Sequence, residues 1–205
     1  MRARAMGLDA FAMPLFAVEP LAWSAPDPRT FDGLLLTSAN AVRHAGPELG
    51  KLHSLPVHAV GAATAEAAAA AGLTVGTVGS GGIEELLTQL PPELRLLHLS
   101  GEQRKTAKAW QGGLTPLPVY RSVAIAKPMG LHRLEGAVAL VHSPRAGDRL
   151  ARLVQRREQI AVAAISAAAA EACDGGWQEM AVAERPNDDA VLSLAASLCK
   201  RADLE

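Results

Sequence analysis

Two parts of this 205-residue chain repeat each other at one constant offset, Ser38 corresponding to Ser143, which is 105 residues further on. A long period that occurs only twice indicates two related units rather than a solenoid. We therefore expect two units of about 100 residues, a common domain size, with a small ligand bound by the pair. Three pairs of segments keep the offset without a gap: Leu34–Ser38 with Ala139–Ser143, 60–67 with 165–172, and 86–88 with 191–193.

Short apolar runs alternate with helix-like stretches in both units. Gly33–Thr37 is continuously apolar, which is typical of a strand buried on both faces. Ser38 is suited to cap a helix that begins near Asn40. Strands that alternate with helices of this length indicate an α/β fold with parallel sheets and right-handed crossovers. The expected strands are 10–16, 33–37, 56–60, 75–78, 94–99, 117–125, 137–142, 160–165 and 180–183, and the expected helices include 64–71, 83–89, 105–111, 146–156, 167–173 and 190–200.

The repeat also predicts a gap in the first unit. The expected strand 94–99 and helix 105–111 have counterparts that the offset places at or before the start of the chain. The first unit therefore starts within its first helix and lacks its first strand. Because the first strand of a doubly wound sheet is usually interior, we expect its absence to expose surface that is otherwise buried.

Composition excludes several classes of protein. A net charge of −1 argues against nucleic-acid binding, which usually needs a basic patch. Cys173 and Cys199 match no metal or redox spacing, and the six histidines are scattered, so we expect no metal site. No apolar stretch is long enough to span a membrane, and no signal peptide is recognisable. We expect a cytoplasmic protein with no membrane partner.

Candidate binding residues lie at turns where a strand gives way to a helix. Backbone N–H groups at such turns are free, and the helix dipole favours an anion there. The same residue types are ordinary helix caps, so capping alone remains an alternative at each turn. No dinucleotide fingerprint, P-loop or nucleophile elbow is present. The turns are Thr37-Ser38-Ala39-Asn40, 60–64, Ser100-Gly101 and 142–145.

Tyr120 is the only tyrosine of the chain and lies in the extended stretch between the two sets of elements. Two interpretations are open. A tyrosine that faces a cleft can donate a proton, and a tyrosine at a junction between domains can equally be a packed aromatic side chain.

The most characteristic motifs of the chain are Thr37–Val42, Val60–Ala65 with Ala71-Gly72, Val119-Tyr120 after Gly112-Gly113, Ser143-Pro144, and Glu184-Arg185-Pro186 with Leu192–Leu198. Taken in order, these motifs resemble the uroporphyrinogen-III synthase family from about residue 3 to residue 201. The resemblance implies two flavodoxin-like lobes joined by a two-strand linker. Lobe one would contain residues 1–17 and 125–205, lobe two residues 23–117, and the linker strands residues 18–22 and 118–124.

The resemblance also implies a function. The family closes hydroxymethylbilane, a linear tetrapyrrole, into uroporphyrinogen III with loss of water and inversion of ring D, a step of haem biosynthesis that needs no metal and no organic cofactor. Tyr120 would be the acid, a monomer would suffice, and the alanine-rich composition suggests a bacterial member. The expected substrate-binding residues are Thr37, Ser38, Asn40, Gly61, Thr64, Ser100, Gly101, Ser143 and Ser166.

A second class of function stays open from the sequence. An intracellular two-lobed α/β module that binds a small anionic ligand without catalysis would show the same turns. The isomer formed from hydroxymethylbilane discriminates between the two classes, because a binding module gives no excess of isomer III.

Overall fold

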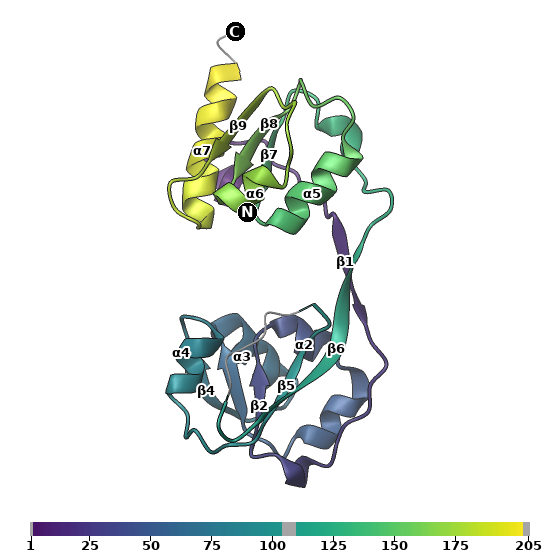
Figure 1. Ribbon diagram of the computed structural model, residues 1–205, viewed down its shortest axis with the longest axis vertical. Coiled ribbons are helices and arrows are strands. Elements are labelled where there is room, and N and C mark those ends of the chain that lie inside the picture. Colours follow the sequence, from purple (N-terminus) through teal and green to yellow (C-terminus); the bar gives the residue numbers. More distant parts are fainter. Residues whose placement is uncertain (1, 104–109, 203–205) are drawn as a thin grey trace. The chain divides into compact units, whose positions relative to one another are not determined.

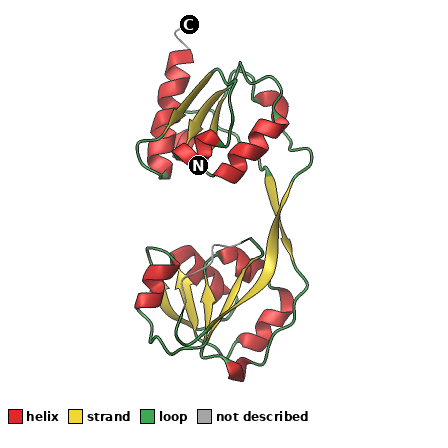
Figure 2. Cartoon of the chain, in the orientation of Figure 1, coloured by secondary structure: helices red, strands yellow, loops and turns green. Residues whose placement is uncertain are grey.

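The computed structural model describes residues 2–103 and 110–202 (Figures 1 and 2). Most of the expected helix 105–111 lies outside the described residues. By its contacts the chain divides into two units, unit 1 with residues 1–16 and 124–205 and unit 2 with residues 17–123. Unit 1 contains α1 (Arg2–Ala5), η3 (Leu131–Arg133), β7 (Val138–Val141), α5 (Pro144–Leu153), β8 (Ala161–Ala164), α6 (Ala167–Glu171), β9 (Glu179–Val182) and α7 (Asp188–Ala202).

Unit 2 contains most of the larger sheet, which has the strand order β1-β6-β5-β2-β3-β4. The pairs β6–β5, β5–β2, β2–β3 and β3–β4 are all parallel. The elements are β1 (Phe16–Pro20), η1 (Pro28–Thr30), β2 (Gly33–Leu36), α2 (Ala39–His44), η2 (Gly46–Leu52), β3 (Val57–Val60), α3 (Ala62–Ala70), β4 (Val75–Gly79), α4 (Ile83–Thr88), β5 (Leu96–Gly101) and β6 (Leu114–Ala124).

Helices cover both faces of the unit 2 sheet. Leu34 and Leu36 of β2 pack into a core with Ala41 and Val42 of α2 and Ala68 of α3. Leu35 points to the opposite face and packs with Leu86 and Leu87 of α4. This alternation follows from the period of two along a strand. It explains why β2 is apolar at every position, and it confirms the predicted α/β fold with parallel sheets.

Unit 1 repeats this arrangement with fewer strands. Its sheet has the order β7-β8-β9, and both pairs are parallel. Residues of β7 and β8 pack on one side against α5 and α6, and on the other side against α7. The offset of 105 residues carries β2 onto β7, and α4 onto the start of α7.

The strands β1 and β6 pair where the chain passes between the units. Leu21 N–H donates to Val119 O at 2.9 Å, and Ile125 N–H donates to Leu15 O at 3.0 Å. The lower-numbered residue of one segment pairs with the higher-numbered residue of the other, so the two strands run antiparallel.

The expected strand 10–16 is wrong, because regular strand structure begins only at Phe16. The side chains of residues 11–15 do alternate between partly buried and exposed, and Phe11, Met13 and Leu15 pack against the unit 1 core. The corresponding residues in unit 2 lie in β6, which hydrogen-bonds to β5. No strand in the described part of unit 1 takes the place of β5, so the alternating segment has no neighbour with which to form a ladder.

Candidate active site

The carboxyl ends of the parallel strands of unit 2 gather most of the predicted site residues at one edge. Thr37 follows β2 directly, Gly61 follows β3, and Ser100 and Gly101 end β5. Tyr120 lies in β6 in register with Gly101. In open α/β sheets ligands bind outside this edge, so the fold brings these residues to a position suited to a ligand.

Thr37 and His98 are joined at this edge. His98 is only 3% exposed, and its Nε2 lies 3.1 Å from the hydroxyl oxygen of Thr37. His98 sits next to β2 because β5 and β2 pair in register, Leu35 opposite His98. The hydrogen bond orients the Thr37 hydroxyl, which the sequence assigned to substrate binding.

Tyr120 lies close to β5 and α2. It is partly buried and packs against the core of unit 2. A methyl group added at Gly101 would lie 2.9 Å from Tyr120 Cζ and 3.1 Å from its hydroxyl oxygen. The imidazole of His44, on α2, has its centroid 6.3 Å from that of the phenol ring, with the two planes tilted by 38°. Two different elements therefore surround the candidate acid.

The turn after β3 leaves backbone groups open to a ligand. Gly61 has φ of 86°, a left-handed conformation that favours glycine, and it provides no side chain to cap α3. Ala62 and Ala63 in the first turn of α3 are exposed. Thr64 is buried, with 5% of its surface accessible. The start of this helix is therefore accessible to an anion through its backbone, whereas the Thr64 side chain is buried.

Several predicted hydroxyl groups are engaged in local structure. Ser38 Oγ accepts a hydrogen bond from Asn40 N–H at 3.2 Å, so it caps α2. In unit 1, Ser143 Oγ accepts from Ala146 N–H and Ser166 Oγ accepts from Ala169 N–H, at 3.2 and 3.3 Å. Each serine still has its own O–H to donate. Capping, the alternative raised by the sequence, is present at all three positions.

Ser100 differs from the other predicted hydroxyl residues. It is 1% exposed, and its Oγ has no hydrogen-bond partner among the described residues.

Ser143 and Ser166 belong to unit 1, where they follow the neighbouring strands β7 and β8. The structure therefore gathers Thr37, Ser38, Gly61, Gly101 and Tyr120 at the edge of unit 2 and places the two serines at the equivalent edge of unit 1.

Sequence reasoning missed His98 and His44. His44 follows Asn40 by four residues and so lies on the same side of α2, a spacing that could have identified it. His98 is the only polar side chain within the apolar run 96–99, where an imidazole needs a partner. Within the described ranges, neither residue belongs to a cluster of three or more side chains that could hold a metal ion.

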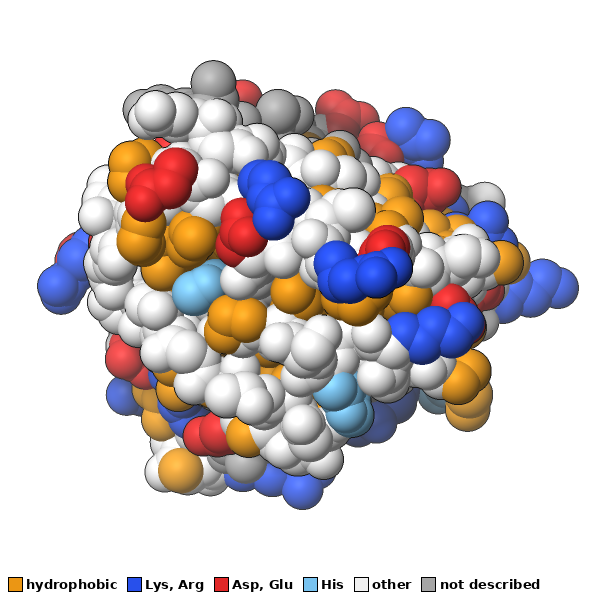
Figure 3. Space-filling model, turned by 90° about the horizontal axis from the view of Figure 1, so that it is seen from below, with side chains coloured by type: hydrophobic (Ala, Val, Ile, Leu, Met, Phe, Trp, Pro, Cys, Tyr) orange, Lys and Arg blue, Asp and Glu red, His pale blue; other side chains and the backbone are white. Residues whose placement is uncertain are grey.

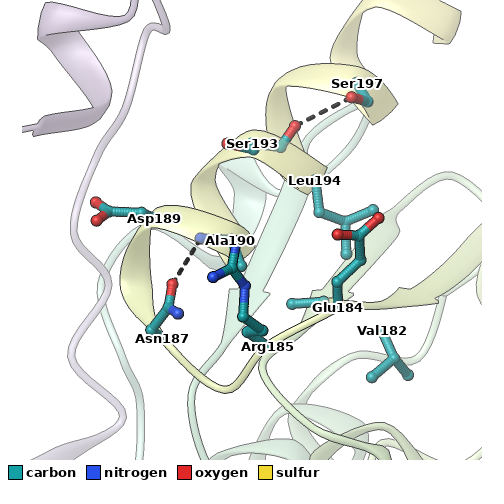
Figure 4. Close-up of a pocket in the computed structure, with 10 residues that line it drawn as sticks. Val182, Glu184, Arg185, Asn187, Asp189, Ala190, Ser193, Leu194 and Ser197 are labelled. Carbon is teal, nitrogen blue, oxygen red and sulfur yellow. Dashed lines mark hydrogen bonds between the residues drawn. The ribbon is translucent and has the colours of Figure 1, made fainter.

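A separate hollow of about 460 Å³ lies in unit 1 beside the start of α7 (Figure 4). Its lining has both signs of charge, from Glu184, Arg185 and Asp189. Asn187 Oδ1 accepts a hydrogen bond from Ala190 N–H at 2.9 Å and so caps the helix. The hollow contains none of the predicted site residues.

Surface charge is mixed. Figure 3 shows acidic and basic side chains interspersed on the face that it draws, in line with the net charge of −1. Because no broad basic field is present among the described residues of this face (Figure 3), an anion would be held by local backbone groups and hydroxyls.

No helix in the described ranges is long and apolar enough to cross a membrane.

These observations define a two-unit α/β protein with parallel sheets and hydroxyl side chains at their carboxyl edges. A family profile described as "Uroporphyrinogen-III synthase HemD" matches residues 1–193. The chain belongs to the uroporphyrinogen-III synthase family.

Solved structures of this family have the same fold. The uroporphyrinogen-III synthetase of Helicobacter pylori is 20% identical, with a TM-score of 0.67 over 90% of this chain and 91% of that one. A mutant uroporphyrinogen III synthase from the extremely thermophilic bacterium Thermus thermophilus is 22% identical, with a TM-score of 0.50 over 98% and 92% of the two chains. A comparison with curated proteins gives no match.

Proposed function

We propose that this protein is a uroporphyrinogen-III synthase that closes hydroxymethylbilane into uroporphyrinogen III, with inversion of ring D and loss of water. The family match over residues 1–193 carries this proposal. It is supported by the gathering of Thr37, Gly61, Gly101 and Tyr120 at the carboxyl edge of the unit 2 sheet.

Positioning would supply most of the catalysis. The linear substrate closes unaided to the uninverted isomer, so the protein must hold ring D with its substituted carbon at the reacting centre. Carboxylates of the substrate would bind at helix starts such as that of α3, where N–H groups are free. Thr37, Ser38, Asn40, Thr64, Ser100, Gly101, Ser143 and Ser166 remain the proposed binding residues with Gly61.

Tyr120 would act as the general acid. A phenol is protonated at neutral pH and can donate its proton to the departing hydroxyl, which leaves as water. The substituted α-carbon of ring D would form a carbon–carbon bond to the methylene that has lost the hydroxyl, and the bond from that α-carbon to the bridge of ring C would break. The bridge would then bond to the free α-carbon of ring D, whose released proton balances the one donated. The position of Tyr120 beside the end of β5 supports this role.

The setting of the enzyme is part of the proposal. We propose a cytoplasmic bacterial monomer that acts on a small molecule without a nucleic-acid partner and without a cofactor. The family members reported above come from bacteria, and the net charge of −1 supports the absence of a nucleic-acid partner. The proposed lobes remain 1–17 with 125–205, and 23–117, joined by strands 18–22 and 118–124.

The deciding experiment supplies freshly made hydroxymethylbilane and separates the uroporphyrinogen isomers that form. Excess isomer III over a heat-denatured sample supports the synthase. Isomer I alone, at the rate of the denatured sample, would contradict the proposal and leave a binding module.

The role of Tyr120 is tested with Tyr120→Phe, which removes only the hydroxyl. General acid catalysis contributes roughly 10²–10⁴-fold, so we expect the turnover number kcat to fall by about that factor. The affinity for uroporphyrinogen III should change much less. Thr88→Val is the matched control, because it removes another hydroxyl of unit 2 whose bond is to Glu85 O within α4. Equal kcat for Tyr120→Phe and the parent would remove Tyr120 from the acid role.

A further inference from the structure

The phenol ring of Tyr120 occupies space that exists only because residue 101 has no side chain. A methyl group at Gly101 would lie 2.9 Å from Tyr120 Cζ, 3.0 Å from Cε2 and 3.1 Å from the hydroxyl oxygen. Real Cβ atoms essentially never come within 3.0 Å of such a neighbouring atom. The contact involves the hydroxyl end of the ring, so any side chain at position 101 must displace the reactive group.

The backbone itself does not require a glycine at this position. The glycines with positive φ in the described chain include Gly61, Gly72 and Gly113, and Gly101 is not among them. Gly101 is also the last residue of a strand, where glycine is unfavourable because it loses more conformational freedom than other residues. The steric demand of the Tyr120 ring is therefore the reason that the geometry gives for a glycine here.

His44 contacts the same ring from a different element. Its imidazole centroid lies 6.3 Å from the phenol centroid, a separation within the usual range for paired rings. Both rings are partly buried, and α2 is fixed at its start by the Ser38 cap. The imidazole thus limits the movement of the phenol ring on the side of α2.

The related unit lacks this arrangement. The offset places Leu15 at the position of Tyr120 and Arg149 at that of His44. Arg149 instead donates to Ile125 O at 2.6 Å, a bond within unit 1. The arrangement of glycine, phenol and imidazole is therefore a property of unit 2 and not of the scaffold that the two units share.

We propose that Gly101 and His44 are positioning residues that fix the direction in which the Tyr120 hydroxyl points. The bare Cα of Gly101 leaves room for the phenol at the end of β5, and the His44 ring holds it from α2. This inference rests on the proposed function, in which Tyr120 is the acid. Neither residue itself touches the reacting atoms.

The first test is Gly101→Ala against Gly33→Ala. A methyl group at Gly33 would lie 2.8 Å from His58 Nε2, so both variants crowd the unit 2 sheet. Gly33 begins β2, at the opposite end of that strand from the site. We expect Gly101→Ala to lower kcat at least tenfold with KM within threefold of the parent, and Gly33→Ala to change both by less than threefold. Equal losses of kcat in the two variants would overturn the assignment.

A second measurement does not depend on activity. Tyr120 is the only tyrosine, so a tyrosine ¹³C-labelled on the ring gives the signals of one residue by NMR. We expect these signals to move in Gly101→Ala and to stay at the parent position in Gly33→Ala. Unchanged signals in Gly101→Ala contradict the proposal even where activity is lost. Parent-like activity of Tyr120→Phe with shifted Gly101→Ala signals would instead contradict the acid role alone.

Two further comparisons separate positioning from general damage. In a Tyr120→Phe background, Gly101→Ala should lower kcat by less than threefold. Gly101 acts through the Tyr120 hydroxyl, so the effects of the two substitutions on kcat should not add once that hydroxyl is gone. His44→Ala should lower kcat about tenfold, and His44→Phe, which keeps a flat ring, should restore at least half of the parent rate. Failure of His44→Phe to restore the rate would overturn the assignment of His44 as a packing partner of the ring.

Discussion

β2 and β7 hold the same place in the two repeats, but their surroundings differ. β2 is paired on both edges, with β3 and β5, and its three leucines are completely buried. Within the described residues β7 pairs only with β8. Val138, Ala139 and Leu140 of β7 are accordingly only partly buried. Two similar apolar runs thus reach different burial because one has a second neighbouring strand.

The chemistry of the two units differs in the same direction. Unit 2 carries Thr37, Thr64 and Tyr120, and the offset gives His142, Ala169 and Leu15 at the equivalent positions of unit 1. Ser38 and Ser143 are kept as caps in both units. The duplicated scaffold therefore keeps the residues that start its helices, while the two threonine hydroxyls and the phenol of unit 2 have no counterparts at the equivalent positions of unit 1.

The largest expected effect separates Leu35 from its counterpart Leu140. Leu35 is fully buried against α4, whereas Leu140 is partly exposed. Leu35→Ala should destabilise unit 2 by about 2–5 kcal/mol, the usual cost of a buried leucine. Leu140→Ala should destabilise unit 1 by about 1–2 kcal/mol, because folding buries less of the apolar surface of Leu140 than of Leu35. Urea unfolding followed by NMR signals of each unit measures both, and equal losses would contradict the comparison.

The next effect concerns backbone amides and needs no substitution. Ala137 O and Val141 O accept hydrogen bonds from Ala161 and Ile165, so these residues face β8. Since neighbouring residues of a strand face opposite edges, Leu140 directs its N–H away from β8. Its amide should exchange with solvent at least tenfold faster than that of Leu35, a difference of about 1.4 kcal/mol in opening free energy.

The matched control for exchange is the pair Leu34 and Ala139. Leu34 N–H donates to Pro56 O at 2.8 Å, on the side of β3, and its counterpart Ala139 faces β8. Both amides are therefore protected by an equivalent neighbour. The exchange rates of Leu34 and Ala139 should differ less than those of Leu35 and Leu140. If the two pairs differ equally, the cause is a difference in overall stability between the units and not a missing neighbouring strand.

Periodicity predicted the elements well, but it could not predict which strands have neighbours. The apolar run at Gly33–Thr37 and the caps at Ser38 and Ser143 are local signals, and the structure has each of them. Residues 10–15 have the alternation of a strand and yet form none, because a strand needs a hydrogen-bonding partner that local sequence does not specify. The contact of Tyr120 with Gly101 and His44 depends on the register of β5 and β6, which periodicity also leaves open.

A smaller difference between the units should depend on pH through His58. Its ring is 7% exposed, and neither ring nitrogen has a hydrogen-bond partner among the described residues. Burial lowers the pKa of His58 below the ordinary value of 6.5. The unfolded chain therefore binds a proton that the folded chain does not, and unit 2 should lose stability as pH falls from 6.5 toward the folded pKa.

Unit 1 supplies the internal control for this acid sensitivity, since Ala163 stands at the position of His58. Urea midpoints of unit 2 measured between pH 7 and 5 should fall, and His58→Leu should reduce that slope. A histidine titration by NMR with a folded midpoint at or above 6.5 would contradict the prediction.

The smallest expected effect comes from an exposed ion pair that only unit 2 contains. Hydrogen bonds from the Arg95 side chain, at 2.8 and 2.9 Å, and from its backbone N–H lower the pKa of Asp32 to about 2. The pair links the residues before β2 and β5, and Ala137 replaces Asp32 in unit 1. A depressed carboxyl pKa stabilises the fold above the unfolded value near 3.8, and this contribution disappears as pH falls through about 2.

This ion pair is tested by titrating the Asp32 carboxyl carbon by NMR in the parent and in Arg95→Gln. The parent midpoint should lie near 2, and the variant midpoint should rise toward 3.8 because the charged donor is gone. Salt should raise the parent midpoint, since exposed charges are screened. If the Asp32 midpoint is the same in Arg95→Gln as in the parent, the backbone N–H of residue 95 alone stabilises the carboxylate. The start of β2 would then be linked to the start of β5 by that hydrogen bond and not by the ion pair.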